Sequence, residues 1–289
     1  MQNQSEEPTV LVTGASSGIG FSIAEGLAGA GWKVFAGVRG DDDARKLQAA
    51  HENIRAVRLD VTSNDSITSV EAILREALSG RTLNGLVNNA GIAKMGPLAL
   101  QPMDEIRAHF DVNAFGLMAV TKAMLPLLGT DETRTGPKGR IVNITSVGGE
   151  VSAPFLGAYC ATKHAVESFT DSLRRELIIY DIDAIAVGPG SVKTPIWDKA
   201  EDANRDARYE SSRWGLALSI FADVMLQGGK DGLPPEKVAE TVEEALTAKK
   251  PKARYAPVPD KLTNWILPRL LPKRVVDGFM AKRYGLKMK

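Results

Sequence analysis

The chain has 289 residues, with 44% hydrophobic and 25% charged side chains, values that are ordinary for a globular protein able to bury a sizeable core. Its formal net charge of +1 gives no reason to expect a nucleic-acid partner. The single cysteine, Cys160, excludes an internal disulfide framework, and the polar N-terminus lacks the apolar stretch of a secretory signal, so we expect a cytoplasmic protein.

The chain begins with the order strand, glycine turn, helix. A β-branched run at Thr9–Thr13 predicts a buried strand, and an apolar helical pattern covers Phe21–Ala30. Three glycines lie between them in the spacing Gly14-x3-Gly18-x-Gly20, which allows a tight turn at a helix N-terminus whose free N–H groups can bind a pyrophosphate. The pattern predicts a dinucleotide site, with an ordinary strand–helix turn as the alternative. The residues expected at this site are Gly14, Ser16, Ser17, Gly18, Ile19 and Gly20.

A second strand, Lys33–Val38, ends at Arg39, about twenty residues beyond the glycine turn. At this position an acidic residue suits a ribose 2′-hydroxyl, whereas an arginine suits a 2′-phosphate. Arg39 therefore favours NADP(H) over NAD(H), although three neighbouring acids, Asp41 to Asp43, oppose that preference.

Strand and helix patterns alternate along the following residues. We expect helices at Asp41–Ala50, Ser63–Leu78, Pro102–Leu128 with a break near Asn113, Gly157–Tyr180, Ser212–Leu226 and Glu236–Ala248, and strands at Ile54–Leu59, Gly85–Val87, Arg140–Thr145, Ala184–Val187 and Ala253–Ala256. No apolar run is long enough for a membrane span, and the pattern suggests no metal site. The alternation predicts an α/β fold with a doubly wound parallel sheet.

Tyr159 precedes Lys163 by four residues in one of these helices, and Ser146 lies thirteen residues before the tyrosine. Residues i and i+4 share a helix face, where a lysine ammonium would lower the pKa of a phenol. Such a tyrosine can exchange a proton with a carbonyl or alcohol oxygen, and a nearby serine hydroxyl can bind the same oxygen. The alternative is a surface Tyr and Lys that share a face by chance.

Six motifs in order resemble those of the short-chain dehydrogenases/reductases, over roughly residues 9 to 195. They are Thr13–Gly20 (TGASSGIG), Asn88–Gly91 (NNAG), Asn113, Ser146, Tyr159-x3-Lys163 and Pro189-Gly190-x-Val192-x-Thr194. The resemblance implies a single Rossmann-type domain of about seven strands flanked by helices. It also implies hydride transfer between a nicotinamide dinucleotide and an alcohol/carbonyl pair, and a homodimer or homotetramer.

The resemblance also implies a role for each site residue. Tyr159 is the expected acid/base, Ser146 orients the substrate oxygen, and Lys163 lowers the tyrosine pKa and binds the nicotinamide ribose. Asn113 holds a water that links Lys163 to solvent. The further residues expected near the cofactor are Asp60, Val61, Asn89, Ala90, Gly91, Pro189, Gly190, Val192 and Thr194. Ser17 stands where many NADP-preferring members carry a basic residue, which leaves Arg39 as the only basic determinant.

Two regions follow the last motif. We expect residues 1–257 to form the catalytic domain, with a substrate lid at about 195–233 whose Trp214, Leu218, Phe221 and Met225 favour a lipophilic substrate. The alternative is a helix packed on its own core. Residues 258–289 form a basic, amphipathic extension that could contact an anionic membrane surface, or pack on the body or on a second subunit.

The sequence therefore predicts an NADP(H)-dependent oxidoreductase that acts on an alcohol/carbonyl pair. A steroid, a retinoid, and a long-chain or aromatic carbonyl are the expected substrate types, and no feature of the sequence selects one of them. The alternative is a non-catalytic dinucleotide-binding or redox-sensing protein on the same fold. The complete set Asn113, Ser146, Tyr159 and Lys163 favours the enzyme, because a pure binder needs no proton-transfer group.

Overall fold

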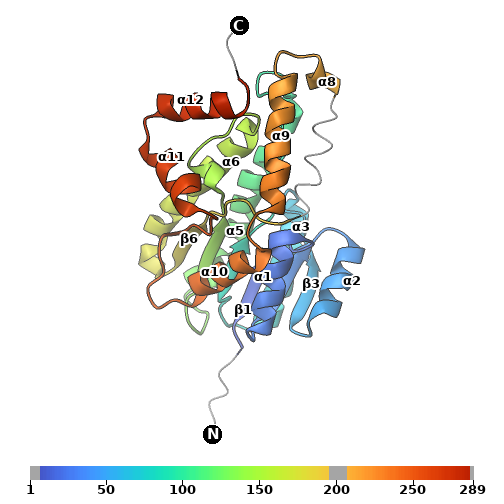
Figure 1. Ribbon diagram of the computed structural model, residues 1–289. Coiled ribbons are helices and arrows are strands. Elements are labelled where there is room, and N and C mark those ends of the chain that lie inside the picture. The colour runs from blue at the N-terminus through green and yellow to red at the C-terminus, as the bar shows by residue number, and fades with distance from the viewer. Residues whose placement is uncertain (1–6, 195–206, 287–289) are drawn as a thin grey trace.

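The computed structural model describes residues 7–194 and 207–286. A seven-stranded parallel sheet runs through the molecule in the order β3-β2-β1-β4-β5-β6-β7 (Figure 1). Its strands are β1 (Thr9–Val12), β2 (Lys33–Val38), β3 (Ile54–Arg58), β4 (Gly85–Asn88), β5 (Arg140–Ile144), β6 (Asp183–Val187) and β7 (Arg254–Tyr255). The strand order reverses between β1 and β4, and in such sheets ligands bind outside the carboxyl ends of the strands at this point.

Helices cover both faces of the sheet, as the alternating pattern predicted. One face carries α1 (Gly18–Gly29), α2 (Asp41–Ala50) and α10 (Pro235–Thr247), and the other carries α3 (Asn64–Leu78), α5 (Leu117–Leu125) and α6 (Gly157–Glu176). Each layer has its own apolar core. Because the sheet is covered on both sides, its central strands are mostly apolar, and every residue of β1 and β4 is buried. The Rossmann-type fold expected from the sequence is confirmed.

A continuous helical stretch runs from Met103 to Thr130 and changes its geometry on the way. It consists of α4 (Met103–Phe110), the π-helical η1 (Asp111–Gly116), α5 and the π-helical η2 (Pro126–Thr130). The expected break near Asn113 is therefore a π-turn and not an end of the helix. Among the described residues this is the one helix long and apolar enough to cross a membrane by length and composition. The inner face of α5 lies in the core beneath the sheet, the position of a core helix.

The C-terminal part of the chain forms a third, smaller core beside the sheet. Here α9 (Gly215–Lys230) packs Phe221 between Phe155 and Tyr284, with ring centroids 5.5 Å and 5.0 Å apart. Leu218 lies in the same core. The expected lid residues Leu218 and Phe221 are therefore core residues, because α9 turns its apolar face inward. Residues 195–206 of the expected lid lie outside the described residues.

The basic extension folds into three short elements beyond β7. They are η6 (Leu262–Ile266), α11 (Leu267–Leu270) and α12 (Lys273–Arg283), and Figure 1 shows α11 and α12 on the side of the molecule that carries β6 and α6. Tyr284, after α12, is 8% exposed against α9, whereas Leu270 is 76% and Phe279 is 65% exposed. The extension thus packs on the body at some positions and presents apolar side chains to solvent at others.

Candidate active site

The glycine turn is built by backbone constraints at the carboxyl end of β1. Gly14 and Gly18 have φ angles of +63° and +55°, a region that side chains rarely adopt. A Cβ on Gly14 would lie 2.7 Å from the Cα of Ala90, and one on Gly20 would lie 2.2 Å from the Gly14 carbonyl oxygen. The turn therefore packs directly on the Asn89–Gly91 tract after β4.

This turn leaves the first amides of α1 available to an anion. Ser17 occupies the N-cap position, and within the described residues its hydroxyl accepts no capping hydrogen bond. The α1 N-terminus also carries no acidic residue in its first turn. A positive helix end beside close-packed glycines fits a dinucleotide pyrophosphate, so the residues present suit the predicted cofactor.

Thr13 and Asn89 hold this turn to β4. The Thr13 hydroxyl accepts hydrogen bonds from the backbone N–H groups of Asn89 and Ala90, both at 3.0 Å. The Asn89 amide nitrogen donates to the carbonyl oxygens of Thr13 and Gly14, at 3.1 and 2.9 Å. The side chain of Asn89, expected beside the adenosine, is therefore used to fix the shape of the turn.

Arg39 lies exposed at the carboxyl end of β2, and the acids that follow it have other partners. Asp41 lies 3.9 Å from the Arg58 guanidinium, and Asp42 pairs with Arg45. Together with Asp43 these acids form the first turn of α2, where the helix dipole stabilises negative charge. Arg39 has no ion-pair partner in the described part of the chain, so its charge is available to a ligand phosphate.

Asp60 and Val61 follow β3 at the same edge of the sheet. The Asp60 carboxylate accepts hydrogen bonds from the Thr62 N–H and hydroxyl at 2.9 and 2.7 Å, and these bonds, with the Arg39 charge as a lesser cause, lower its pKa. Val61 is 7% exposed and belongs to the core.

Asn113 lies in the π-turn and joins three segments. Its Oδ1 accepts a 2.8 Å hydrogen bond from the Ile92 N–H, and its Nδ2 donates to the Ile92 carbonyl oxygen at 2.9 Å and to Thr162 Oγ1 at 3.1 Å. A Cβ on Gly91 would lie 3.4 Å from Asn113 Oδ1 and 3.8 Å from Lys163 Nζ. Asn113 and Lys163 therefore border the same small volume beside Gly91.

Ser146 and Tyr159 meet where β5 ends and α6 begins. Ser146 precedes the 3-10 turn η3 (Val147–Gly149), and its hydroxyl accepts a 3.0 Å hydrogen bond from the Gly148 N–H. Burial raises the pKa of Tyr159 to about 12, and a hydrogen bond with the Ser146 side chain lowers it by less. The neighbouring Cys160 thiol is 1% exposed with its pKa raised by burial, which disfavours a reactive-thiol role.

Lys163 lies one helical turn beyond Tyr159 and is 5% exposed. Its ammonium donates a 2.8 Å hydrogen bond to the Ile144 carbonyl oxygen and lies 5.7 Å from the centroid of the Tyr159 ring. Burial lowers the pKa of Lys163 to about 8, and the Glu167 carboxylate acts in the opposite direction. The expectation of a lowered tyrosine pKa is wrong for this structure, because burial of the phenol outweighs its neighbours and the ammonium binds a carbonyl oxygen instead.

The Pro189–Thr194 loop follows β6 at the same edge. The Val147 N–H donates to the Pro189 carbonyl oxygen at 3.0 Å, so the loop lies directly beside the turn that carries Ser146. Gly190 packs on Val258, and Val192 is 3% exposed in the core. Of this loop, Thr194 is the last residue before the gap in the described chain.

Sequence reasoning missed a buried polar chain that joins β4, β5 and their covering helices. Asn88 Nδ2 donates to Thr121 Oγ1 and Asn143 Oδ1, and Asn143 Nδ2 donates to Thr170 Oγ1, each at 2.9 Å. The signal was present, because Asn143 is a polar residue inside an otherwise apolar strand pattern. Arg254 was also missed, and its signal was weaker, since it begins a strand of only two residues.

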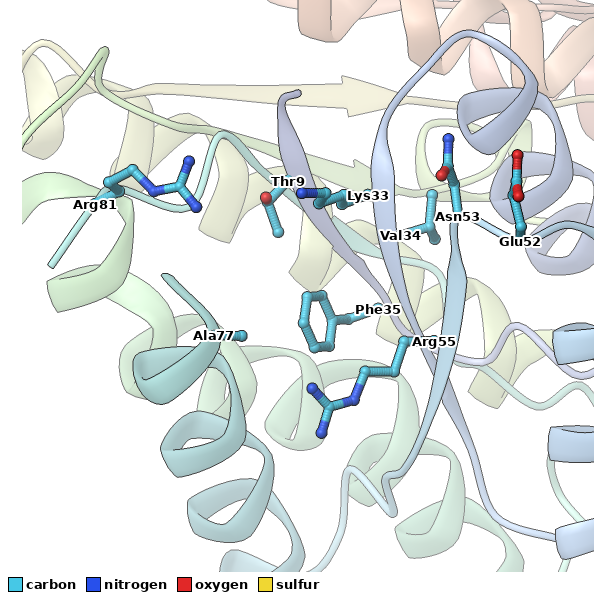
Figure 2. Close-up of a pocket in the computed structure, with 9 residues that line it drawn as sticks. All are labelled: Thr9, Lys33, Val34, Phe35, Glu52, Asn53, Arg55, Ala77 and Arg81. Atoms are coloured by element: carbon cyan, nitrogen blue, oxygen red, sulfur yellow. The ribbon is translucent and has the colours of Figure 1, made fainter. Parts of the chain in front are cut away.

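A pocket at the opposite edge of the sheet does not belong to this site. Figure 2 shows it between the first residues of β1, β2 and β3, where Thr9, Lys33, Phe35 and Arg55 line it. The predicted site residues instead gather at the carboxyl edge, where α/β sheets bind ligands.

Comparison with known proteins identifies the family of the chain. The family model described as "short chain dehydrogenase" matches residues 8–205. The chain is 36% identical to the "NADPH-dependent 3-dehydrocapnine reductase" of Ornithobacterium rhinotracheale, over 94% of this chain and 95% of that protein. It is 33% identical to the "Retinol dehydrogenase 5" of Mus musculus, over 94% and 87% of the two chains.

Solved structures share the fold over nearly the whole chain. A short-chain dehydrogenase from Streptomyces avermitilis aligns with a TM-score of 0.74 and 27% identity, over 96% of this chain and 95% of that one. A short chain dehydrogenase/reductase from Burkholderia phymatum in complex with NAD aligns with a TM-score of 0.75 and 26% identity, over 94% and 95%. The chain therefore belongs to the short-chain dehydrogenases/reductases and is an oxidoreductase of carbonyl and alcohol substrates.

Proposed function

We propose that this enzyme is an NADP(H)-dependent carbonyl reductase or alcohol dehydrogenase in which Tyr159 is the general acid/base. The observation that carries the proposal is the meeting of Ser146, Tyr159 and Lys163 at the carboxyl edge of β5, on the same side of the sheet as the glycine turn. The relatives named as reductases and dehydrogenases support the enzyme over a non-catalytic binding protein.

The residues divide the work of a carbonyl reduction. A bound nicotinamide dinucleotide would supply the hydride to the carbonyl carbon. The Tyr159 phenol, protonated because its pKa is about 12, donates its proton to the carbonyl oxygen. The Ser146 hydroxyl donates a hydrogen bond to the same oxygen and so orients it for the transfer.

Lys163 and Asn113 serve the proton supply. With a pKa of about 8, Lys163 is mostly protonated near neutral pH, and its ammonium, 5.7 Å from the centroid of the Tyr159 ring, is a nearby positive charge for the phenolate that remains after the proton has left, although it is too weak to offset the effect of burial on the tyrosine pKa. Asn113 borders the Gly91 volume together with Lys163, which supports its proposed role of holding a water on the path to solvent.

Tyr159→Phe tests the assignment, because it removes the transferable proton and keeps the ring. We expect turnover to fall by about 10²–10⁴-fold while NADPH binding is retained. Tyr180→Phe, in the helical turn η4 (Leu177–Tyr180) beyond α6, is the matched control and should leave turnover unchanged. A Tyr159→Phe enzyme that keeps more than about a tenth of wild-type turnover would contradict the proposal.

Arg39 is proposed to select NADP(H) by pairing with the 2′-phosphate. Its exposed, unpaired guanidinium supports this, and so does the NADPH dependence named for one relative, whereas a solved neighbour was crystallised with NAD. Arg39→Asp should weaken NADPH binding at least tenfold and spare NADH, since a charge-assisted bond contributes about 1.5–3 kcal/mol. Arg55→Asp makes the same charge change at the far edge of the sheet and should alter neither affinity. Equal wild-type affinity for both cofactors would exclude the preference.

The substrate is proposed to be lipophilic. Trp214 and Leu216 present apolar surface at the start of α9, with exposed fractions of 37% and 77%. One relative is named a retinol dehydrogenase, which is consistent with this class. A panel of retinoids, steroids, long-chain aldehydes and small keto esters, followed by nicotinamide absorbance, tests the proposal. A preference for the small polar keto esters would overturn it.

The proposed division of the chain is a catalytic domain at 1–257, with a lid at about 195–233, and an extension at 258–289 that contacts an anionic membrane. Exposed apolar residues on the extension support the contact, and nearby basic residues such as Arg269 and Lys273 supply charge complementarity. Leu270→Ser with Phe279→Ser should abolish salt-sensitive binding to anionic vesicles, whereas Leu216→Ser should not. An intact chain that does not bind such vesicles would refute the contact.

A cytoplasmic location and a homo-oligomeric state stay predictions. Light scattering would measure the oligomeric state.

A further inference from the structure

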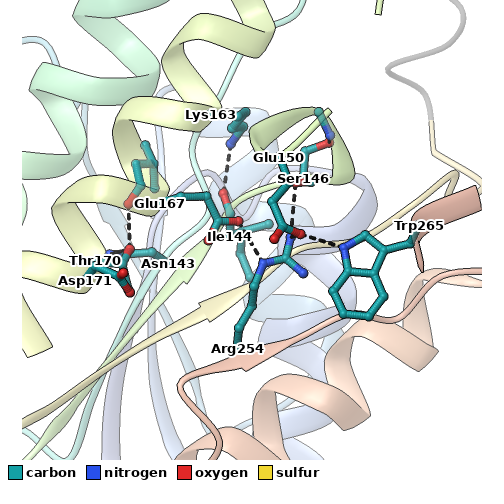
Figure 3. Close-up of polar contacts among 12 residues, drawn as sticks. Asn143, Ile144, Ser146, Glu150, Lys163, Glu167, Thr170, Asp171, Arg254 and Trp265 are labelled. Atoms are coloured by element: carbon teal, nitrogen blue, oxygen red, sulfur yellow. Dashed lines mark hydrogen bonds and ion pairs between the residues drawn. The ribbon is translucent and has the colours of Figure 1, made fainter. Parts of the chain in front are cut away.

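Figure 3 shows a cluster of charged side chains close to Ser146 and Lys163, two residues of the proposed active site. At its centre is Arg254, the first residue of β7, whose side chain is 16% exposed. Its Nε donates a 3.0 Å hydrogen bond to Glu167 Oε1, and its Nη2 lies 2.9 Å from Glu150 Oε2 and 3.3 Å from the Ser146 carbonyl oxygen. One guanidinium therefore contacts three segments of the active site.

Each partner of Arg254 is attached to a residue of the proposed mechanism. The Ser146 carbonyl is the main chain of the residue that orients the substrate oxygen. Glu167 continues the face of α6 that carries Tyr159 and Lys163, because the three residues are spaced i, i+4 and i+8. Glu150 follows the turn η3, which begins next to Ser146. Arg254 thus fixes the end of β5 against α6.

The backbone of β6 leaves room for this side chain. A Cβ on Gly188, directly after β6, would lie 2.1 Å from Arg254 Nη2. Any residue with a side chain at position 188 would displace the guanidinium from the Ser146 carbonyl. Gly188 and Arg254 therefore form a matched pair in this chain.

The C-terminal extension attaches to the same cluster. Trp265 Nε1 donates a 2.5 Å hydrogen bond to Glu150 Oε2, and Arg269 Nη2 lies 2.9 Å from Glu150 Oε1. The guanidinium carbons of Arg254 and Arg269 lie 5.3 and 4.5 Å from the centroid of the Trp265 ring, within the range of cation–π attraction. Arg254, Trp265 and Arg269 lie outside the part of the chain that the family model matches, which ends at residue 205, whereas Glu150 lies inside it.

The cluster also sets the charge that Lys163 meets. Among the described residues, Glu167 is the charged group that acts on Lys163, and it raises the pKa of that lysine. Burial raises the pKa of Glu167, and the Arg254 charge lowers it, with Glu150 as a weaker opposing carboxylate. Lys163 also faces the Tyr159 phenol of its own helix, the neutral Asn113 of η1 and the Ile144 carbonyl of β5. Arg254 therefore opposes the effect of burial and favours the ionised form of Glu167, and an ionised Glu167 favours the protonated lysine.

We propose that Arg254 is a positioning residue for the Ser146, Tyr159 and Lys163 set, and that Trp265 and Arg269 complete this support by holding Glu150. The inference rests on the proposed function, because it assumes that these three residues carry the proton transfer. It means that Arg254, Trp265 and Arg269, which lie beyond the part of the chain matched by the family model, affect the rate of catalysis.

The main test compares Arg254→Met with Arg254→Lys. Methionine fills the space without charge, and we expect kcat to fall about tenfold or more with NADPH affinity changed less than about twofold, since the cofactor turn lies on other strands. Lysine retains the positive charge but cannot make the bidentate hydrogen bonds of a guanidinium. The pH profile of Arg254→Lys should therefore lie close to that of the wild type, whereas its kcat should stay below the wild-type value. Arg175→Met removes an exposed arginine that pairs with Asp171 on α6 and is the matched control.

The pH profile separates positioning from simple destabilisation. In Arg254→Met, Glu167 becomes neutral more readily, Lys163 loses its favourable carboxylate, and the basic limb of the kcat profile moves to lower pH. Glu167→Gln should move the same limb in the same direction, and it keeps the size and polarity of the side chain. Trp265→Phe removes the donor to Glu150 and should lower kcat less than Arg254→Met does.

The outcomes are distinct. An Arg254→Met enzyme with kcat within about twofold of wild type and an unchanged pH profile would overturn the inference. If Arg254→Met does not fold, the variants Glu167→Gln and Trp265→Phe test the inference in its place. Unchanged kcat and pH profiles in both variants would overturn the inference as well. Tyr159→Phe measured in parallel tests the proposed function: if that variant stays active, the proposed function fails, whereas an inactive Tyr159→Phe beside a normal Arg254→Met refutes only the role of Arg254.

Discussion

The glycine turn and the Arg254 cluster border the same site and are built in different ways. Gly14, Gly18 and Gly20 fix the turn through backbone conformation and close contact, and all three lie within seven consecutive residues. The Arg254 cluster depends on side chains, and its hydrogen bonds join residues that are 87, 108 and 115 positions apart. A site built from local backbone leaves a readable motif, whereas one built from distant side chains does not.

The sharpest test of the backbone-built region is a pair of glycine substitutions in α1. Gly20→Ala places a Cβ 2.2 Å from the Gly14 carbonyl oxygen and 2.4 Å from Asn89 Nδ2, so we expect a loss of stability of about 4 kcal/mol. Gly29→Ala, in the same helix, meets no atom of the described structure within 4 Å and should gain about 0.5–1 kcal/mol. Urea unfolding of both variants measures the difference. A loss of stability well below this value in Gly20→Ala would show that the turn can shift to make room for the added Cβ.

A second prediction concerns the buried charge that lies between the two regions. Because burial lowers the pKa of Lys163 from 10.5 to about 8, holding the proton in the folded protein costs about 3 kcal/mol below pH 8. Lys163→Met should therefore be more stable than wild type at pH 7 by about 1–3 kcal/mol, since the lost hydrogen bond to the Ile144 carbonyl offsets part of the gain. The variant should lose activity at the same time.

The sign of the pH dependence follows from proton binding. Between pH 8 and 10.5 the unfolded chain binds the Lys163 proton more tightly than the folded one, so this group makes wild-type stability rise with pH. The advantage of Lys163→Met should consequently shrink on going from pH 7 to pH 9.5. An advantage that is constant with pH would mean that the lysine proton is not responsible.

The smallest expected effect tests how firmly the extension is attached. Tyr284 is 8% exposed and packs on Phe221 at 5.0 Å, so Tyr284→Ala should cost about 2 kcal/mol. Phe279 is 65% exposed on α12, and Phe279→Ala should change stability by less than about 0.5 kcal/mol. Thermal unfolding in parallel compares them. Equal effects would mean that α12 buries a different face from the one described.

The sequence by itself determined those features that short segments decide. Apolar runs separated by helical patterns predicted the sheet, and the observed strands lie where these runs were expected, with some ends shifted by one residue. The glycine spacing predicted the turn, because glycine adopts its positive φ angles without strain and has no Cβ to collide with the atoms around it. The Tyr159 and Lys163 spacing placed both residues on one face of α6.

Only the tertiary structure decided the features that depend on distant neighbours. The pKa of Tyr159 rises because the folded chain buries the phenol, a fact that spacing cannot show. Phe221 faces a core and not a substrate because Phe155 and Tyr284, far away in sequence, close around it. Arg254 reaches Ser146 because β7 pairs with β6, and the pattern that predicted a strand at Ala253–Ala256 does not show which residues its arginine contacts. Contacts between side chains that are far apart in the sequence leave no periodic pattern in it. They can be identified only in the folded structure, where the chain brings these residues together.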